Sequence, residues 1–265
     1  MLALGIDVGS LSAEAVLLND AKEVLATSIL PTGADSRKAG EGALAAVLAA
    51  GGKEAADIGF AVATGYGRIS VEFAGKRVTE ITCHARGIHH LYPEVRTLID
   101  IGGQDSKAIR VSPRGRVLDF IMNDKCAAGT GRFLEVMAGA LEVKLGQLAG
   151  FSAKATEPVP ISSMCTVFAE SEVVSLLAVG HPRENIIGGI HEAIALRTAG
   201  MLRRIGLEEP LAMSGGVAKN LGVVRALEDQ LGCRVILPEE PQIIGALGAA
   251  LIALDALRPP GKDED

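Results

Sequence analysis

Two cysteines of this 265-residue chain precede helix-forming runs and have the residue type and setting needed to bind a metal. They are Cys126, within KCAAGTG, and Cys165, within MCTVF. A thiolate at the start of a helix is stabilised by unpaired backbone N–H groups and by the positive end of the helix dipole. A cubane iron–sulfur cluster uses four such thiolates, so one chain supplies half of a set. Two inert buried thiols are the alternative, because free cysteine often packs as a small hydrophobe.

The other cysteines and a group of histidines are expected to be structural. Cys83 falls inside a predicted helix and is expected to pack in the core, and Cys233 opens an apolar strand. His84, His89 and His90 could suggest a metal site, but the sequence pairs them with no carboxylate or cysteine. We therefore expect these histidines in solvent or at the edge of the core.

A glycine turn after the first apolar strand is suited to binding phosphate. Residues 5–12 read GIDVGSLS. Gly9 lets backbone N–H groups approach phosphate oxygens, and Ser10 and Ser12 add hydroxyl donors. Asp7, at the end of the strand, can hold Mg²⁺, normally through water. A plain β-hairpin with a polar turn is the alternative for this segment taken alone.

Two further loops of similar composition make it harder to explain the first glycine turn as a chance β-hairpin. Residues 100–105 read DIGGQD and repeat the first device about 93 residues later. Here Asp100 could bind a metal or orient water, and Gln104 could position an attacking water. The third loop, residues 213–220 (MSGGVAKN), lies between a strand and a helix and would let an adenosine lie against bare backbone.

Hydrophobic periodicity predicts an α/β chain with an internal duplication of a βββαβα unit. Strands are predicted at 3–8, 14–19, 23–29, 58–63, 96–101, 106–111, 116–122, 159–162, 210–213 and 233–237. Helices are predicted at 36–51, 79–91, 129–140, 144–149, 166–179, 183–205, 217–231 and from Gly245 onward. The first half is expected to cover 1–95, with the C-terminal helix crossing back to it, and the second 96–257, with a flexible tail at 258–265. A nucleotide cleft is expected between the halves.

Composition and charge argue against several classes of function for this chain. The net charge is −6 and no basic stripe with interleaved aromatics occurs, which disfavours nucleic acid as a partner. No uncharged apolar run is long enough to cross a bilayer. Four widely spaced cysteines do not form a secreted disulfide framework, so we expect a cytoplasmic protein.

The three loops, in this order, resemble those of the acetate and sugar kinase, heat-shock protein and actin superfamily. Segments 123–134 (NDKCAAGTGRFL) and 165–173 (CTVFAESEV) narrow the likeness. They resemble the ATP-dependent activators, or activases, of 2-hydroxyacyl-CoA dehydratases and the related benzoyl-CoA reductase ATPase subunits, the BadF-BadG-BcrA-BcrD type. The likeness extends through residues 65–68 and 83–85 to residue 250, nearly the whole chain.

The resemblance implies a homodimer in which Cys126 and Cys165 of both chains hold one shared [4Fe–4S] cluster. It implies ATP or ADP with Mg²⁺, a ferredoxin or flavodoxin as electron donor, and a dehydratase or related CoA-ester reductase as the partner that receives the electron. The catalytic groups would be Asp7, Asp100 and Gln104, and the nucleotide would contact Gly9, Ser10, Leu11, Ser12, Gly102, Gly103, Gly215, Gly216, Val217, Lys219 and Gly245.

One departure and two alternatives accompany this interpretation. Relatives often carry a basic residue where this chain has Glu14, and strand alternation leaves open whether Glu14 faces the phosphates or solvent. A small-molecule kinase of the same fold would need a general-base carboxylate, whereas the second loop offers Gln104. An actin-like assembly ATPase would not need two thiols before helices.

Overall fold

The computed structural model describes residues 1–162 and 165–257, which form two compact units. Unit 1 consists of residues 1–95, 111–118 and the C-terminal segment from 242. Unit 2 consists of residues 96–110 and 119–241. The predicted tail, 258–265, lies outside the described residues. Within the described part, none of the helices combines the length and apolar character that crossing a membrane requires.

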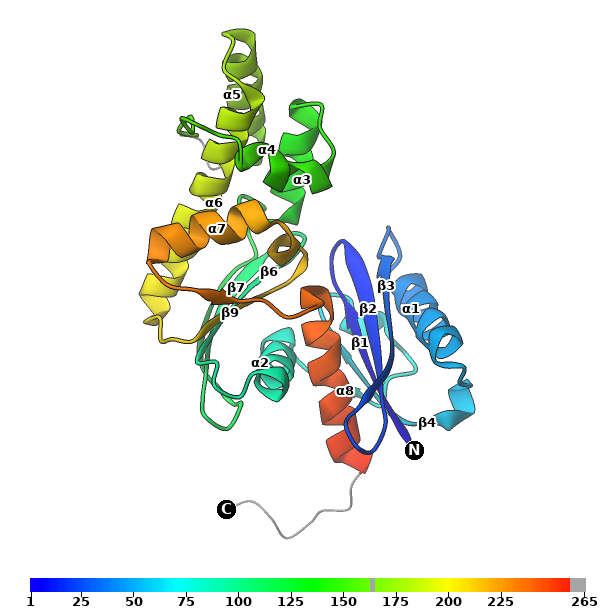
Figure 1. Ribbon diagram of the computed structural model, residues 1–265. Helices are drawn as coiled ribbons and strands as arrows, with labels where there is room; N and C mark the ends of the chain where they lie inside the picture. The colour runs from blue at the N-terminus through cyan, green and yellow to red at the C-terminus, as the bar shows by residue number, and fades with distance from the viewer. Residues whose placement is uncertain (163–164, 258–265) are drawn as a thin grey trace. The chain divides into compact units, whose positions relative to one another are not determined.

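Unit 1 contains a mixed five-stranded sheet in the order β3-β2-β1-β4-β5 (Figure 1). β1 is antiparallel to β2 and parallel to β4. The strands are β1 (Leu2–Val8), β2 (Ser12–Leu18), β3 (Val24–Pro31), β4 (Ile58–Thr64) and β5 (Lys76–Arg77), and the helices are α1 (Ser36–Gly51), α2 (Glu80–Leu91) and α8 (Ile244–Leu257), with short 3₁₀ turns at Ala55–Asp57, Arg68–Ser70 and Pro241–Ile243.

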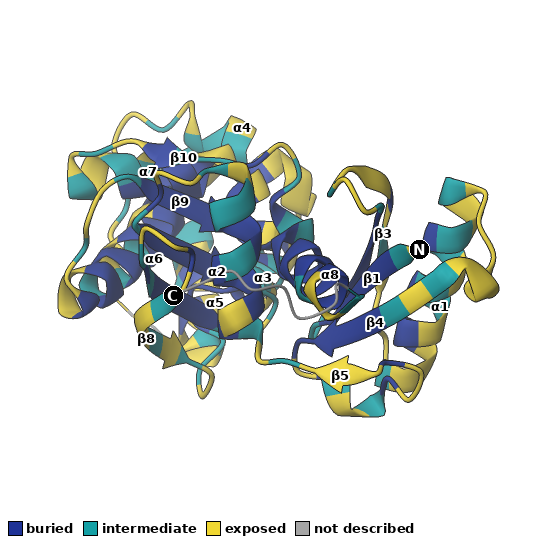
Figure 2. Cartoon of the chain, turned by 90° about the horizontal axis from the view of Figure 1, so that it is seen from below, coloured by how far each residue is buried: buried dark blue, intermediate teal, exposed yellow. Residues whose placement is uncertain are grey.

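Strand alternation in β1 assigns each face of this sheet to a helix layer. Leu4 and Ile6 belong to the hydrophobic cluster that includes α1, and Ala3 belongs to the cluster that includes α8. α8 approaches so closely that a Cβ on Gly5 would lie 2.0 Å from the carbonyl oxygen of Ala246. Figure 2 accordingly shows α8 largely in the colour of buried residues. Asp7 follows Ala3 and Gly5 in the alternation and thus faces the α8 side.

Unit 2 contains a second mixed sheet in the order β10-β9-β6-β7-β8 (Figure 1). β6 is antiparallel to β7 and parallel to β9. The strands are β6 (Thr97–Ile101), β7 (Ser106–Val111), β8 (Val117–Asn123), β9 (Leu211–Ser214) and β10 (Val235–Ile236), and the helices are α3 (Gly131–Ala140), α4 (Leu148–Ser152), α5 (Thr166–Ala178), α6 (Arg183–Ile205) and α7 (Leu221–Leu231), with 3₁₀ turns at Leu145–Gln147 and Gly216–Lys219.

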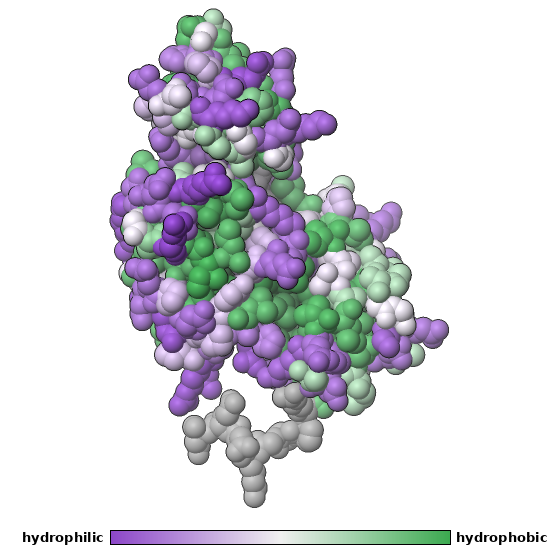
Figure 3. All heavy atoms as spheres, in the orientation of Figure 1, coloured by the Kyte–Doolittle hydropathy of each residue, from purple (hydrophilic) through white to green (hydrophobic). Residues whose placement is uncertain are grey.

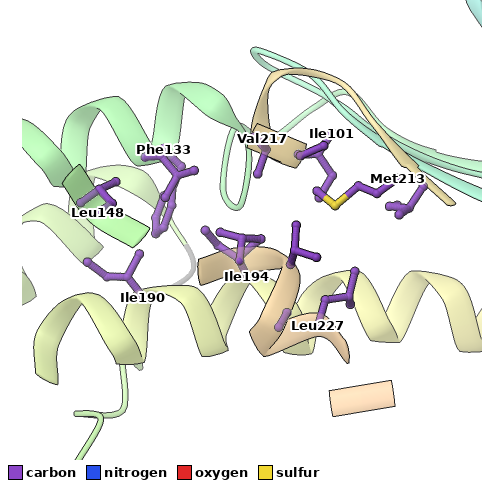
Figure 4. Close-up of a cluster of buried hydrophobic side chains, with 14 of the residues drawn as sticks. Ile101, Phe133, Leu148, Ile190, Ile194, Met213, Val217 and Leu227 are labelled. Carbon is purple, nitrogen blue, oxygen red and sulfur yellow. The ribbon is translucent and has the colours of Figure 1, made fainter. Parts of the chain in front are cut away.

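One hydrophobic cluster holds unit 2 together. It joins Ile101 at the end of β6 to Phe133 of α3 and Ile194 of α6, with Val217 from the loop after β9 (Figure 4). Phe133, Ile101 and Ile194 have no exposed surface. Removing a buried side chain of this size costs about 3–5 kcal/mol for phenylalanine. α3 is therefore fixed against the strand that leads into the second glycine turn.

The predicted α/β class with two similar halves is confirmed, and one predicted element is wrong. No strand forms at 159–162. Pro158 and Pro160 remove ladder donors from this segment. The N–H of Val159 donates instead to the carbonyl of Asn185, and the N–H of Ser162 donates to a side chain. The predicted helix 217–231 is interrupted at Asn220, whose side chain caps α7.

Candidate nucleotide turns and cysteine pair

The first glycine turn exposes backbone donors at the end of β1. The N–H of Gly9 donates to the carbonyl of Ser12 at 2.9 Å, and the Thr32 hydroxyl donates to the carbonyl of Gly9 at 2.9 Å. The backbone N–H groups of Ser10 and Leu11 have no acceptor among the described residues. Two free N–H groups on a closed turn make a site that favours an anion such as phosphate.

Asp7 lies directly before this turn in a crowded position. Its side chain is 10% exposed. A Cβ on Gly65 would lie 2.2 Å from its Oδ1, and a Cβ on Gly245 would lie 2.0 Å from its Oδ2. His84 Nε2 is 3.8 Å from the same Oδ2. The carboxylate can occupy this place only because residues 65 and 245 are glycines without a Cβ. The role of Gly245 is therefore to leave space for the Asp7 side chain.

His84 is a residue that the sequence interpretation placed wrongly. It is 6% exposed and lies against a carboxylate, whereas we expected it in solvent or at the core edge with no carboxylate partner. Glu14 lies in the same region as His84, because it is the residue of β2 that pairs directly with Asp7 of β1. Residues paired in this way point to one face of the sheet. Glu14 is 5% exposed, so of the two open alternatives it does not point to solvent.

The second turn repeats the hydrogen bonding of the first. The N–H of Gly102 donates to the carbonyl of Asp105 at 3.0 Å, and both positions are numbered 93 above Gly9 and Ser12. The N–H groups of Gly103 and Gln104 have no acceptor within residues 1–162 and 165–257. The Gln104 side chain is exposed and makes no hydrogen bond to any described residue. It is available to orient a water molecule.

Asp100 is anchored by two partners inside unit 2. The Ser214 hydroxyl donates to its Oδ1 at 2.8 Å, and Lys107 Nζ is 3.2 Å from its Oδ2. Lys107 also lies 2.9 Å from Asp105, and its side chain is 4% exposed. Both carboxylate oxygens of Asp100 therefore have partners.

The third loop packs against the second turn. Gly215 has a left-handed φ of 85°, and a Cβ there would lie 2.3 Å from the carbonyl oxygen of Ile101. Val217 is buried in the core of unit 2, while Gly216 and Lys219 are exposed. Lys219 Nζ is 2.8 Å from Glu240. Unit 2 thus brings the second loop (100–105) and the third loop (213–220) together. This proximity is necessary if both loops are to contact one ligand.

The two cysteines of interest differ in their relation to a helix. Cys165 is the N-cap residue of α5, is exposed, and its thiol makes no capping hydrogen bond. Cys126 is half-buried in the loop that precedes α3, and α3 begins only at Gly131. The expected placement directly before a helix is therefore found for Cys165 and not for Cys126. α3 and α5 pack against each other, and Cys126 and Cys165 lie in the segments that lead into these two helices.

The remaining thiols have structural positions. Cys83 is completely buried on α2, which confirms the expected packing role, and burial raises the pKa of its thiol to about 12. Cys233 lies two residues before β10, and burial raises its pKa. None of the four cysteines forms a disulfide.

Cys126 and Cys165 are the candidate metal ligands of this chain. Nowhere in residues 1–162 and 165–257 do three or more His, Cys, Asp or Glu side chains gather as metal ligands. One chain instead offers two free, solvent-reachable thiols, one of them beside the unpaired N–H groups of a helix start. This donor set matches half of a four-thiolate site.

The two mixed five-stranded sheets with their helices form a fold that is also found in a sugar kinase. A ROK family glucokinase from Streptomyces griseus shares this fold with a TM-score of 0.59 at 13% identity, covering 96% of this chain and 100% of that chain. A family model for the BadF/BadG/BcrA/BcrD ATPase family matches residues 4–253. The chain belongs to this ATPase family.

The chain is also similar to individual members over nearly its whole length. It is 52% identical over 256 residues to the activator of lactoyl-CoA dehydratase from Anaerotignum propionicum, covering 97% of this chain and 98% of the relative. Component A of the (R)-2-hydroxyglutaryl-CoA dehydratase from Acidaminococcus fermentans superposes with a TM-score of 0.93 at 47% identity, covering 97% and 98%. The activator of 2-hydroxyisocaproyl-CoA dehydratase from Clostridium difficile, solved with bound ADPNP, gives a TM-score of 0.92 at 43% identity, covering 97% and 95%.

Proposed function

We propose that this chain is a dehydratase activator, an ATPase that couples ATP hydrolysis to low-potential electron transfer into a 2-hydroxyacyl-CoA dehydratase or related CoA-ester reductase. The observation that carries the proposal is the presence of Cys126 and Cys165 in the unit that also holds two nucleotide-type loops. Similarity to three proteins named as activators or components of such dehydratases supports it. An assembly ATPase or a metabolite kinase would have no use for the thiols.

The nucleotide would be held mainly by backbone groups. The free N–H groups of Ser10 and Leu11 and of Gly103 and Gln104 would bind phosphate oxygens. Mg²⁺ would be held near Asp7, whose carboxylate is fixed by its neighbours. The remaining contacts, a proposal made on sequence position and loop geometry, are Gly9, Ser12, Gly102, Gly215, Gly216, Val217 and Lys219, with Gly245 acting through Asp7.

Hydrolysis requires a water molecule placed in line with the terminal phosphate. Gln104 is exposed, lies on the second turn and can accept from and donate to water without becoming a strong base. Asp100 is buried and holds Lys107 and Ser214 on its two oxygens, so we assign it a supporting role. Its contribution would be to fix the Ile101–Gly102 corner of the turn.

Cys126 and Cys165 of two chains would hold one [4Fe–4S] cluster in a C₂ homodimer. When bound, the cluster would supply a site that stores one electron at low potential. The surface beside Cys165 suits protein contact because Val167 and Phe168 are 66% and 67% exposed. Figure 3 shows hydrophobic and hydrophilic atoms interspersed over the α5 end of unit 2. Large exposed apolar side chains at one place favour a protein partner.

The two nucleotide states would differ in affinity for the partner, since a ligand shifts a conformational equilibrium only through differential binding. ATP binding would favour the form that docks the dehydratase, and hydrolysis would release it. A reduced ferredoxin or flavodoxin would reload the dimer. Similarity to the named activators supports the dehydratase as partner. The electron carrier is proposed from the family resemblance of the sequence.

The test is activation of a purified dehydratase. Anaerobically reduced protein is mixed with lactoyl-CoA dehydratase, and dehydration of the CoA ester is followed with ATP, with ADP and without nucleotide. Activity that needs both this protein and ATP is expected, and it should be lost in Cys165→Ala but kept in Cys233→Ala. ATP-dependent phosphorylation of a metabolite, with no dehydratase activation, would contradict the proposal.

A further inference from the structure

The start of α3 lacks an ordinary cap and is held instead by the second glycine turn. Thr130 is the N-cap residue, and its side chain makes no capping hydrogen bond to the helix. The N–H of Gly131 donates to the carbonyl of Gly102 at 2.9 Å, and the N–H of Arg132 donates to the carbonyl of Gly103 at 2.9 Å. The first N–H groups of a helix need an outside acceptor, and here the turn provides it.

The same two peptide units of the turn present their other ends to the proposed phosphate site. A peptide unit is planar, so its N–H and C=O point in fixed opposite directions. The unit that carries the Gly102 carbonyl ends in the free N–H of Gly103, and the unit that carries the Gly103 carbonyl ends in the free N–H of Gln104. An anion bound by these N–H groups therefore acts on the groups that cap α3.

The chain between α3 and Cys126 has little freedom to absorb a displacement. The N–H and the hydroxyl of Thr130 both donate to the carbonyl of Ala127, at 3.0 and 2.5 Å. Asn123 Nδ2 donates to the carbonyl of Cys126 at 2.8 Å. Ala128 and Thr130 are completely buried. Movement at the start of α3 is thus transmitted to Cys126.

Resting on the proposed function, we propose that Gly131 is a positioning residue that couples nucleotide occupancy of the second turn to the position of Cys126. The contact leaves little space, because a Cβ on Gly131 would lie 3.3 Å from the Gly102 carbonyl oxygen. Glycine here permits the close approach of helix and turn on which the coupling depends.

Gly131→Pro removes one donor, and its ring Cδ would replace the hydrogen that points at the Gly102 carbonyl oxygen, 2.9 Å from the nitrogen, so the turn must move away from the start of α3. Proline is favoured at the first position of a helix, where Gly131 lies. The residue before proline must be extended, and Thr130 already is, with φ −100° and ψ 179°. Gly139→Ala is the matched control, because it changes a glycine of the same helix at which a Cβ would meet nothing within 4 Å.

The measurement is amide hydrogen exchange of the peptide covering residues 123–134 in the full-length, anaerobically purified protein, with and without Mg-ADPNP. Binding of ADPNP is measured in parallel by calorimetry. ADPNP is expected to slow exchange at residues 126–130 by about fivefold or more in the wild type and in Gly139→Ala. In Gly131→Pro, which still binds ADPNP, the change is expected to fall below about twofold.

The outcomes separate this coupling from the proposed function. A wild type that does not bind ADPNP defeats the nucleotide half of the proposed function and the coupling with it. Binding without any exchange change at 126–130, or a full change in Gly131→Pro, overturns the coupling and leaves the proposed function standing. Loss of ADPNP binding in Gly131→Pro would make Gly131 a plain support of the turn, also against the coupling.

A second variant covers the case in which Gly131→Pro does not fold. Gly131→Ala keeps the N–H but forces the turn to shift by a few tenths of an ångström. Without nucleotide, it is expected to alter exchange at residues 126–130, whereas Gly139→Ala does not. Equal exchange in both variants would overturn the coupling.

Discussion

Lys107 offers the strongest test of how unit 2 holds its second turn. Its ammonium lies between Asp100 at 3.2 Å and Asp105 at 2.9 Å, and the side chains of Lys107 and Asp100 are 4% and 3% exposed. Replacing lysine by methionine keeps the volume but leaves a buried carboxylate without its cation. Breaking a buried pair in this way costs about 3–5 kcal/mol. That is a large part of a domain's usual 5–15 kcal/mol, roughly.

The compensating variant separates charge from packing. Lys107→Met with Asp100→Asn removes both charges, and the asparagine oxygen still accepts from Ser214. Asp105 is the remaining carboxylate, and at 24% exposure its side chain can be hydrated. We expect the double variant to lose only about 1–2 kcal/mol, so the two changes should be strongly non-additive.

Urea unfolding at neutral pH, followed by far-ultraviolet circular dichroism, measures these free energies. Lys38→Met is the control, because its ammonium is 4.0 Å from Asp35 with an 81% exposed side chain. An exposed pair of this kind contributes under about 1 kcal/mol. A loss below about 1 kcal/mol in Lys107→Met, or a double variant as unstable as the sum of the single ones, would refute the reasoning.

Three further predictions follow from single buried positions. Burial lowers the pKa of His191 to about 4. As the pH falls below 6.5, the unfolded chain therefore takes up a proton at His191 before the folded chain does. The free energy of unfolding should be unaffected by this histidine above pH 6.5 and should fall by about 3 kcal/mol between pH 6.5 and 4. His191→Gln should flatten unfolding free energy against pH in that window, and an unchanged slope would contradict this. Gly245→Ala would place a methyl 2.0 Å from the Asp7 carboxylate and should cost about 1–3 kcal/mol and weaken Mg-ADPNP binding in calorimetry, whereas Gly200→Ala, with open space, should do neither. Cys83, with its pKa raised to about 12 and no exposed surface, should resist iodoacetamide in the folded protein and react in urea, as peptide mass spectrometry would show.

Local sequence signals located several elements well. The predicted helix at 183–205 has the same bounds as α6, because Pro182 precedes it and Gly206 ends it with a left-handed φ of 76°. The start of α3 was predicted two residues early. Gly129 has a left-handed φ of 83° and Thr130 is extended, so the helix begins only at Gly131.

Lys107 could have been found from the sequence, and His84 could not. The predicted strands 96–101 and 106–111 form a tight antiparallel hairpin, and the symmetric register of such a hairpin places Asp100 opposite Lys107. The equivalent hairpin places Asp7 opposite Glu14. The approach of His84 to Asp7 depends on how α2 and α8 pack on the sheet, a tertiary contact that no local pattern encodes.

The central claim is that two chains share one cluster through Cys126 and Cys165, and anaerobic iron and sulfide analysis of the purified protein tests it most directly. We expect about two irons and two sulfides per chain, a dimer by mass, and loss of iron in Cys126→Ala and Cys165→Ala but not in Cys233→Ala. An iron-free wild type under strict exclusion of oxygen, or a complete cluster in Cys126→Ala, would contradict the account.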